Sequence, residues 1–215
     1  MDVSDETKQP QEDTAWRTRL AAAIAQLPEH VDLPYEYTPE GQRMAIFRKM
    51  CPKEFMQKIE RNLLPDAESF DRVALWDGSF PGPIAYGGAD TAKTRATWSA
   101  MGRLYVKQNK PFAWFPIKRL LSEMETYDKS GDVHEFFRKY ARFPLLMVDD
   151  VEKLNWDFGS NVELLFAFYD WIYRESRPCL SSTNKPPDWW EERVGEGLTR
   201  RLFKDGHFAV ELKKP

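Results

Sequence analysis

Cysteine, histidine and long apolar runs are scarce in this chain of 215 residues. The two cysteines, Cys51 and Cys179, lie far apart and in no metal-binding spacing, which fits reduced thiols in a cytosolic protein. The three histidines are isolated, so they form neither a ligand cluster nor a nucleophilic triad. No window reaches the roughly 18 apolar residues that a membrane span needs. We therefore expect a soluble protein without a membrane anchor.

An excess of basic charge is also absent, because the net charge is −3 and the pI is about 5.8. Without a global basic field, the composition does not require a nucleic-acid partner. A local basic patch remains open around Arg200, Arg201 and Lys204. The first fifteen residues are polar and acidic and lack the basic and apolar regions of a signal peptide. We expect a cytoplasmic protein.

Apolar residues are numerous enough for one sizeable core, since 42% of the chain is hydrophobic and 14% is aromatic. This suits one α/β domain with a short N-terminal extension. We predict a disordered acidic tail at 1–13, a helical extension at 14–50 and the main domain at 51–215. Helices are predicted, in chain order, at Ala15–Leu27, Gly41–Met50, Pro52–Asn62 and Ala67–Trp76.

From residue 84 onward, apolar runs typical of strands alternate with stretches of helical spacing. Five strands that alternate with helices predict a parallel sheet covered by helices, as in a three-layer α/β sandwich. The predicted strands are Ile84–Tyr86, Phe112–Phe115, Leu145–Asp149, Cys179–Thr183 and Phe208–Leu212. The predicted helices are Lys93–Val106, Ile117–Tyr127, Val133–Tyr140, Val162–Glu175 and Trp189–Phe203.

A phosphate-binding loop is indicated between the first of these strands and its helix. The pattern G-x-x-x-x-G-K-[ST] is met by Gly87, Lys93 and Thr94, while Ala92 stands where the second glycine belongs. In such a loop, backbone N–H groups and the helix N-terminus face the phosphates. The lysine reaches the outer phosphates and the hydroxyl residue ligates Mg²⁺. The added methyl group of Ala92 has a cost only if that position needs a positive φ.

The alternative for this segment is a Gly-Gly turn before a helix, with the lysine and threonine there by accident. The candidate nucleotide contacts are Gly87, Gly88, Ala89, Asp90, Thr91, Ala92, Lys93, Thr94 and Arg95.

Two carboxylates lie at the end of the buried strand Leu145–Asp149: Asp149 is its last residue and Asp150 follows it. Ligands in open α/β sheets lie at the carboxyl ends of the strands. Asp149 is therefore a candidate for the Mg²⁺ shell beside Thr94, and Asp150 is a candidate general base for an attacking water. The alternative is an Asp-Asp turn that caps the next segment, although the spacing from Lys93, one strand-helix unit, favours the first interpretation.

Polar residues also end the strand Cys179–Thr183, and a pair of arginines precedes the last strand. Asn184 is positioned to contact a γ-phosphate or to orient the hydrolytic water; a simple turn residue is the alternative. Arg200 and Arg201 offer planar guanidinium groups that suit phosphate charge in a neighbouring subunit. Their alternative role is a solvated basic helix end that complements the helix dipole.

Four motifs in this order resemble an AAA+ ATPase of the DnaC/IstB type, a group of bacterial and phage helicase loaders and transposase helpers. The resemblance covers about residues 50–212. The residues that carry it are Tyr86–Arg95, Leu145–Asp150, Ser182–Asn184 and Leu198–Leu202, followed by Gly206–Val210. It implies a five-stranded parallel sheet of the P-loop class, here in the main domain 51–215. No helical lid is expected after the last strand.

The resemblance also implies roles for the candidate residues, with ATP and Mg²⁺ as cofactors. Lys93 and Thr94 are implied as nucleotide and Mg²⁺ contacts, and Asp149 with Asp150 as the acidic pair. Asn184 is implied as the γ-phosphate sensor. Arg201, or Arg200, is implied as an arginine finger that acts on a neighbour's site and so requires an oligomer.

Three functions follow from this resemblance. The first is an ATP-dependent loader or remodeller of a replicative helicase or similar DNA-processing protein, with single-stranded DNA as a further ligand, in a bacterial cell or a phage-infected host. The second is a transposase-assisting ATPase that binds duplex DNA as a filament. The third is an adaptor that keeps the fold for protein contacts with little hydrolysis, an alternative suggested by Ala92.

Overall fold

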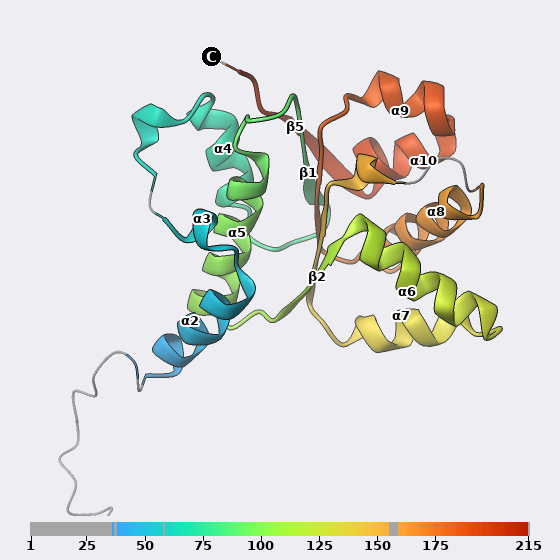
Figure 1. Cartoon of the computed structure of the whole chain (residues 1–215), viewed down its shortest axis with the longest axis horizontal. Helices are drawn as coiled ribbons and strands as arrows, with labels where there is room; N and C mark the ends of the chain where they lie inside the picture. The colour runs from blue at the N-terminus through green and yellow to red at the C-terminus, as the bar shows by residue number, and fades with distance from the viewer. Residues whose placement is uncertain (1–35, 37, 58, 155–158, 215) are drawn as a thin grey trace, which may run out of the picture.

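A five-stranded sheet forms the centre of the protein (Figure 1), in a computed structural model that describes residues 36, 38–57, 59–154 and 159–214. All neighbouring strands are parallel and follow the order β2-β3-β4-β1-β5. The predicted α/β fold with a five-stranded parallel sheet is confirmed. The strands are β1 (Gly82–Tyr86), β2 (Phe112–Pro116), β3 (Leu145–Asp149), β4 (Cys179–Thr183) and β5 (His207–Glu211).

Helices cover both faces of the sheet (Figure 1). Neighbouring residues of each strand enter opposite layers, since Leu146 and Val148 of β3 pack on one side and Leu145 and Met147 on the other. One layer holds α2 (Pro39–Met50), α4 (Ala67–Ala74) and α5 (Lys93–Gln108). The other holds α6 (Ile117–Lys129), α7 (Val133–Ala141), α8 (Gly159–Arg174), α9 (Pro187–Val194) and α10 (Glu196–Arg200).

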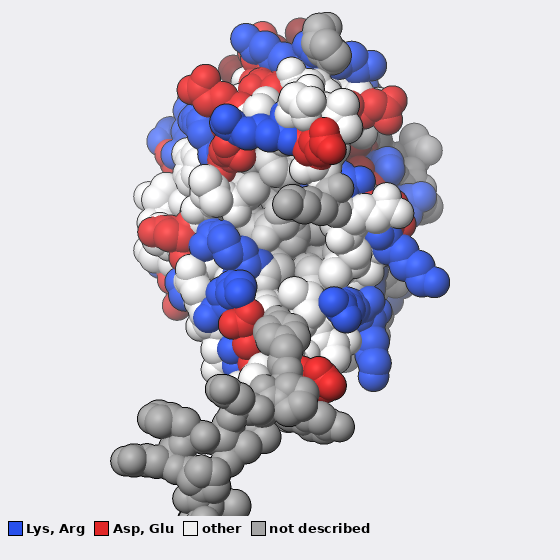
Figure 2. Space-filling view, turned by 90° about the vertical axis from the view of Figure 1, so that its left-hand side faces the viewer, with Lys and Arg blue, Asp and Glu red and all other residues white. Residues whose placement is uncertain are grey.

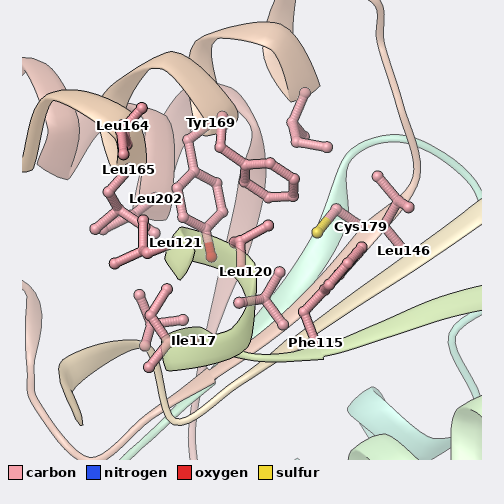
Figure 3. Packing of buried hydrophobic residues seen from close by; sticks show 14 of the residues in the cluster. Phe115, Ile117, Leu120, Leu121, Leu146, Leu164, Leu165, Tyr169, Cys179 and Leu202 are labelled. Atoms are coloured by element: carbon pink, nitrogen blue, oxygen red, sulfur yellow. The ribbon is translucent and has the colours of Figure 1, made fainter. Parts of the chain in front are cut away.

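The larger core cluster lies between the sheet and the α6–α8 layer. Figure 3 shows Phe115, Leu146 and Cys179 of the strands facing side chains of α6 and α8. Tyr169 of α8 is fully buried there, and its hydroxyl lies 3.0 Å from Ser181 Oγ. Ser181 Oγ in turn lies 3.2 Å from His207 Nε2, so a buried polar chain joins α8 to β4 and β5.

The second layer includes α2, which we assigned to the N-terminal extension. Thr38 caps this helix by accepting a hydrogen bond from the Gly41 N–H at 3.0 Å. Phe47 of α2 packs edge-on against Trp98 of α5, with ring centroids 5.9 Å apart. Gly102 permits this contact, because a Cβ there would lie 2.8 Å from the Phe47 ring. The predicted tail at 1–13 and the predicted helix Ala15–Leu27 lie outside the described residues.

Two helix predictions are wrong. The segment Pro52–Asn62 forms only a short helix, α3 (Lys53–Met56), followed by extended backbone and a 3-10 turn, η2 (Arg61–Leu63). The predicted helix Trp189–Phe203 is interrupted at Gly195, whose φ of 81° and ψ of 171° end α9. The chain then continues through α10 and a π-helical turn, η4 (Arg201–Asp205). Among the described helices, none combines the length and apolar character needed to cross a bilayer.

Candidate nucleotide-binding site

The loop between β1 and α5 begins at a position that only glycine fits. Gly87 has a φ of 138°, and a Cβ on it would lie 2.2 Å from the carbonyl oxygen of Leu212. The Leu212 N–H donates to Tyr86 O at 2.8 Å, so the chain after β5 runs directly beside the start of the loop. The close approach of two backbones therefore explains this glycine.

Ala92 occupies the left-handed region at the other end of the loop. Its φ of 64° and ψ of 18° place it at the N-cap of α5, and Asp90 is also left-handed with a φ of 63°. The question left open by the sequence is thereby answered, because this position does need a positive φ. An L-residue there costs about 1–2 kcal/mol, which glycine avoids.

Lys93 turns its ammonium group back into the loop. Its Nζ donates to Gly88 O at 2.6 Å and to Thr91 Oγ1 at 3.1 Å, and Thr91 Oγ1 donates to the same carbonyl at 3.0 Å. The residue is only 7% exposed. Burial lowers its pKa, while the nearby carboxylates of Glu152, Asp150, Asp149 and Asp90 raise it. A buried cation therefore lies inside the concave side of the loop.

The sheet brings the acidic motif and the polar strand end to the same edge as this loop. The register pairs Tyr86 with Thr183 and Val148 with Ser181, so all three strands end side by side. Asp149 is buried and accepts a short hydrogen bond from the Ser182 hydroxyl. Burial raises the pKa of Asp149, and the Ser182 bond opposes that rise. Serine on β4 thus holds the carboxylate in place.

Asp150 follows in the left-handed conformation, with a φ of 57°. Its N–H donates to Asp149 Oδ1 and to Ser182 Oγ, both at 3.2 Å. Its carboxylate pairs with Lys153 at 2.7 Å and remains partly exposed to solvent. The acidic pair is therefore divided: one carboxylate is buried under β4, and the other is turned toward solvent.

Asn184 contacts a residue that sequence reasoning missed. Its Nδ2 donates to Glu152 Oε1 at 2.5 Å, and Glu152 Oε2 is buried without a hydrogen-bond partner among the described residues. Of the four carboxylates that raise the Lys93 pKa, that of Glu152 has the largest effect. The sequence signal that could have identified Glu152 was its place two residues after Asp150. Glu152 thus links the polar end of β4 to the surroundings of Lys93.

An apolar wall faces the loop across a cavity of about 530 Å³. Lys93, Thr94 and Asn184 lie on its polar side, and the loop residues from Ala89 to Arg95 line it. The apolar side, which sequence reasoning also missed, is formed by Phe55, Ile59, Leu63 and Pro65. The volume lies within the roughly 300–1,000 Å³ that is usual for ligand pockets.

Arg95 fixes that wall. Its guanidinium donates to Glu54 O at 2.7 Å and to Gln57 O at 2.9 Å, and it lies 5.7 Å from the centre of the Phe55 ring. These carbonyls are bound by a side chain about forty positions away, which accounts for the early end of α3. The sequence placed Arg95 among the candidate nucleotide contacts; in the structure Arg95 lines the cavity, and its guanidinium binds the wall.

The two arginines lie around a separate cavity of about 300 Å³, which shares no lining residue with the one at Lys93. Arg201 pairs with Asp170 at 3.1 Å and with Asp205 at 2.7 Å, and its guanidinium lies 4.0 Å from the Tyr173 ring centre. Arg200 has only a longer contact to Asp205, at 3.5 Å, and its side chain is 52% exposed. Of the two arginines, Arg200 is therefore the one free to reach outward.

The donor set fits a nucleotide with its Mg²⁺ ion better than a metal held by protein alone. Among the described residues, no group of three His, Cys, Asp or Glu side chains converges. Mg²⁺ in phosphate-transfer sites usually takes one or two protein ligands and completes its shell with phosphate oxygens and water. Thr94, at the start of α5, and Asp149 are the two residues with oxygen donors that could hold such an ion.

Comparison with known proteins finds the same fold in replication proteins. No protein-family model and no curated protein sequence matches the chain. The structure of the DnaC helicase loader matches 68% of this chain and 88% of its own, with a TM-score of 0.57 and 16% identity. The replication initiator DnaA, bound to AMPPCP and single-stranded DNA, matches 69% of this chain and 46% of its own, with a TM-score of 0.56 and 21% identity.

A second DnaA structure, from Aquifex aeolicus and bound to AMPPCP, has a TM-score of 0.55 and 22% identity over 73% of this chain. The chain thus spans about half the length of the DnaA proteins that it matches. The chain therefore shares the α/β fold of the DnaC helicase loader and of DnaA. This is the fold that the resemblance to AAA+ ATPases of the DnaC type predicted.

Proposed function

We propose that the chain binds ATP with Mg²⁺ at the loop Gly87–Thr94 and hydrolyses it, as a helicase loader or remodeller in DNA replication. The observation that carries this proposal is the left-handed Ala92 followed by Lys93, whose ammonium already lies inside the loop. A loop that accepts backbone strain to hold this shape has a purpose beyond connecting a strand to a helix.

The residues divide the work as follows. Lys93 exchanges its bonds to Gly88 O and Thr91 Oγ1 for the outer phosphates, which replaces two neutral acceptors by a charged one. The apolar side chains of Phe55 and Ile59 pack against the base. Thr94 and Asp149 would hold the Mg²⁺ ion, which would supply charge neutralisation at the phosphates when bound.

Asp150 accepts the proton of the attacking water, because it is the partly exposed member of the acidic pair. Asn184 keeps one amide N–H on Glu152 and has a second N–H for a phosphate oxygen or for orienting that water. Arg200 or Arg201 of a neighbouring copy supplies the positive charge that stabilises the transition state. Arg200 is the better candidate, since Arg201 is engaged by two carboxylates of its own chain.

The experiment is a steady-state measurement of ATP hydrolysis with the wild type and with Asp150→Asn. Loss of a general base typically costs roughly 10²–10⁴-fold in rate while ATP still binds. Asp128→Asn, the same substitution at an exposed position outside the cavity, is the matched control and should hydrolyse ATP at the wild-type rate. Equal turnover in Asp150→Asn and the wild type would remove Asp150 from the chemistry.

The role in replication is supported by the DnaC helicase loader and the replication initiator DnaA, which share the fold. It predicts that a helicase partner or single-stranded DNA stimulates hydrolysis. A transposase-assisting ATPase differs in forming a filament on duplex DNA, which electron microscopy with ATP would reveal. An adaptor with little hydrolysis differs in showing no stimulation by any of these ligands.

A further inference from the structure

A second cavity, of about 510 Å³, lies along the outer edge of β2. The end of α2 forms one side with Lys49 and Met50, and the end of α7 forms the other with Lys139 and Tyr140. Figure 1 shows α2 and α7 on opposite sides of β2. We call this cavity, with the strand residues Phe112–Phe115 as its floor, the β2-edge groove. It shares no lining residue with the cavity at Lys93.

The edge of β2 is open for pairing. The strand lies at the end of the sheet order, so β3 occupies one side of it and no described strand occupies the other. Unpaired N–H and C=O groups on an edge strand are a template for another extended chain. Pro111 and Pro116 bracket this edge and limit any added strand to a short segment.

The charge of the groove contrasts with that of the whole chain. The described residues that line it include the basic side chains of Lys49, Arg119, Lys139 and Arg142 and no acidic side chain, although the net charge of the protein is −3. Lys139 pairs with Glu123 at 2.6 Å, and the other three have no ion pair within 4 Å among the described residues. In Figure 2, whose right-hand side is the front of Figure 1, Lys and Arg gather along the lower right edge. The groove is therefore complementary to an anionic ligand.

The aromatic residues of the groove are not arranged as stacking platforms for nucleic-acid bases. Trp114 packs against Trp98 with centroids 5.1 Å apart, and Arg142 lies 5.1 Å from the centre of the Phe143 ring. Phe112 and Tyr140 are buried. Binding of single strands relies on free aromatic faces, which these contacts already use.

An apolar contact is available beside the charges. Met50 is 38% exposed at the rim, and Ile46, one turn earlier on α2, is also exposed. Proteins bind extended peptides by strand addition at an exposed sheet edge, with side-chain contacts beside the edge that give specificity. The basic side chains and Met50 are such contacts here.

We propose that the β2-edge groove docks an extended acidic peptide segment of a partner protein, which adds as a strand to β2. Backbone hydrogen bonds to the strand edge supply the register. Lys49, Arg119 and Arg142 contact carboxylates of the peptide, and Met50 contacts its apolar residues. The proposal does not depend on nucleotide, because the loop at Lys93 is not part of the groove.

The test is fluorescence anisotropy of the full chain with a labelled peptide of sequence Asp-Val-Glu-Val-Asp-Val-Glu. The double reversal Arg119→Glu with Arg142→Glu should weaken binding at least tenfold. The matched control, Arg72→Glu with Lys204→Glu, makes the same change in net charge at exposed positions outside the groove and should change binding less than twofold. Equal effects of the two double variants would overturn the proposal.

Strand addition is tested on the peptide rather than on the protein. Methylation of the backbone nitrogens of its valines removes donors without changing charge, and binding should fall at least tenfold. Equal binding of the methylated peptide, or no binding of either peptide, contradicts strand addition. A labelled oligo(dT) of fifteen nucleotides tests nucleic acid as the ligand instead. If it competes with the peptide and no longer binds the groove variant, the groove is a nucleic-acid site and the proposal is wrong. If thermal unfolding shows that the double variant is not folded, Lys49→Glu, at the exposed end of α2, replaces it. This variant should also weaken binding of the peptide.

Discussion

Ala92→Gly should stabilise the protein, contrary to the usual effect of placing glycine in a folded chain. Ala92 has a φ of 64° and a ψ of 18°, and an L-residue in this region costs about 1–2 kcal/mol. Glycine removes that cost but loses about 0.5–1 kcal/mol through its greater freedom in the unfolded chain. The expected net gain in the free energy of unfolding therefore lies between about 0 and 1.5 kcal/mol, with a middle value of about 0.75 kcal/mol.

The assay is urea denaturation, supported by the melting temperature. For a chain of this size, a gain of 1 kcal/mol corresponds to a shift of about 2–4 °C. Ala89→Gly is the matched control, because Ala89 is in the same loop and is not among the residues with positive φ. It should lose about 0.5–1 kcal/mol through unfolded-state entropy alone. Destabilisation by both substitutions to the same extent would refute the claim that the loop strains Ala92.

Three further outcomes are expected. Burial lowers the pKa of His207 from 6.5 to about 4, so the unfolded state binds more protons than the folded state between these pH values. The free energy of unfolding should therefore fall by about 3 kcal/mol on acidification from pH 7 to pH 4. His207→Gln should reduce this fall when urea denaturation is measured across the pH range, and an unchanged dependence on pH would contradict the prediction. Arg201→Ala should lower the free energy of unfolding by about 1–3 kcal/mol, because its contacts to two carboxylates are lost. Arg200→Ala should leave urea denaturation unchanged and lower the rate of ATP hydrolysis. The reverse pattern would exchange the roles of the two arginines. Glu152→Gln keeps an acceptor for the Asn184 amide and should retain the wild-type kcat. Glu152→Ala removes that acceptor and should lower kcat without changing the affinity for ATP. Equal kcat in both variants would leave Glu152 without a positioning role.

The sheet was predictable because short apolar runs alternate with stretches of helical spacing, and because β3 and β4 are followed by polar residues. The bounds of β3 and β4 agree with the prediction residue for residue, since Asp150 and Asn184 mark sharp ends to buried segments. A buried parallel strand needs apolar side chains on both faces, so the pattern depends on local sequence only. The convergence of Gly87, Asp149 and Asn184 at one edge then follows from the parallel topology.

The parts that could not be predicted depend on contacts between distant residues. The early end of α3 results from Arg95 binding the carbonyls of Glu54 and Gln57, a contact that no local pattern contains. The apolar wall at Phe55 follows from the same contact. The left-handed Ala92 was undetermined because alanine gives no sign of positive φ in a sequence. Gly195 could have been recognised as a helix end, since glycine commonly takes this place.

Nucleotide binding is the central claim, and titration calorimetry of the wild type with ATP, in the presence and absence of Mg²⁺, tests it most directly. Binding in the micromolar range is expected for the wild type, and its loss is expected in Lys93→Ala, because the ammonium inside the loop is then absent. Lys204→Ala should bind ATP as the wild type does. No heat of binding in the wild type, or equal ATP affinity in Lys93→Ala, would contradict the assignment of this loop as a nucleotide site.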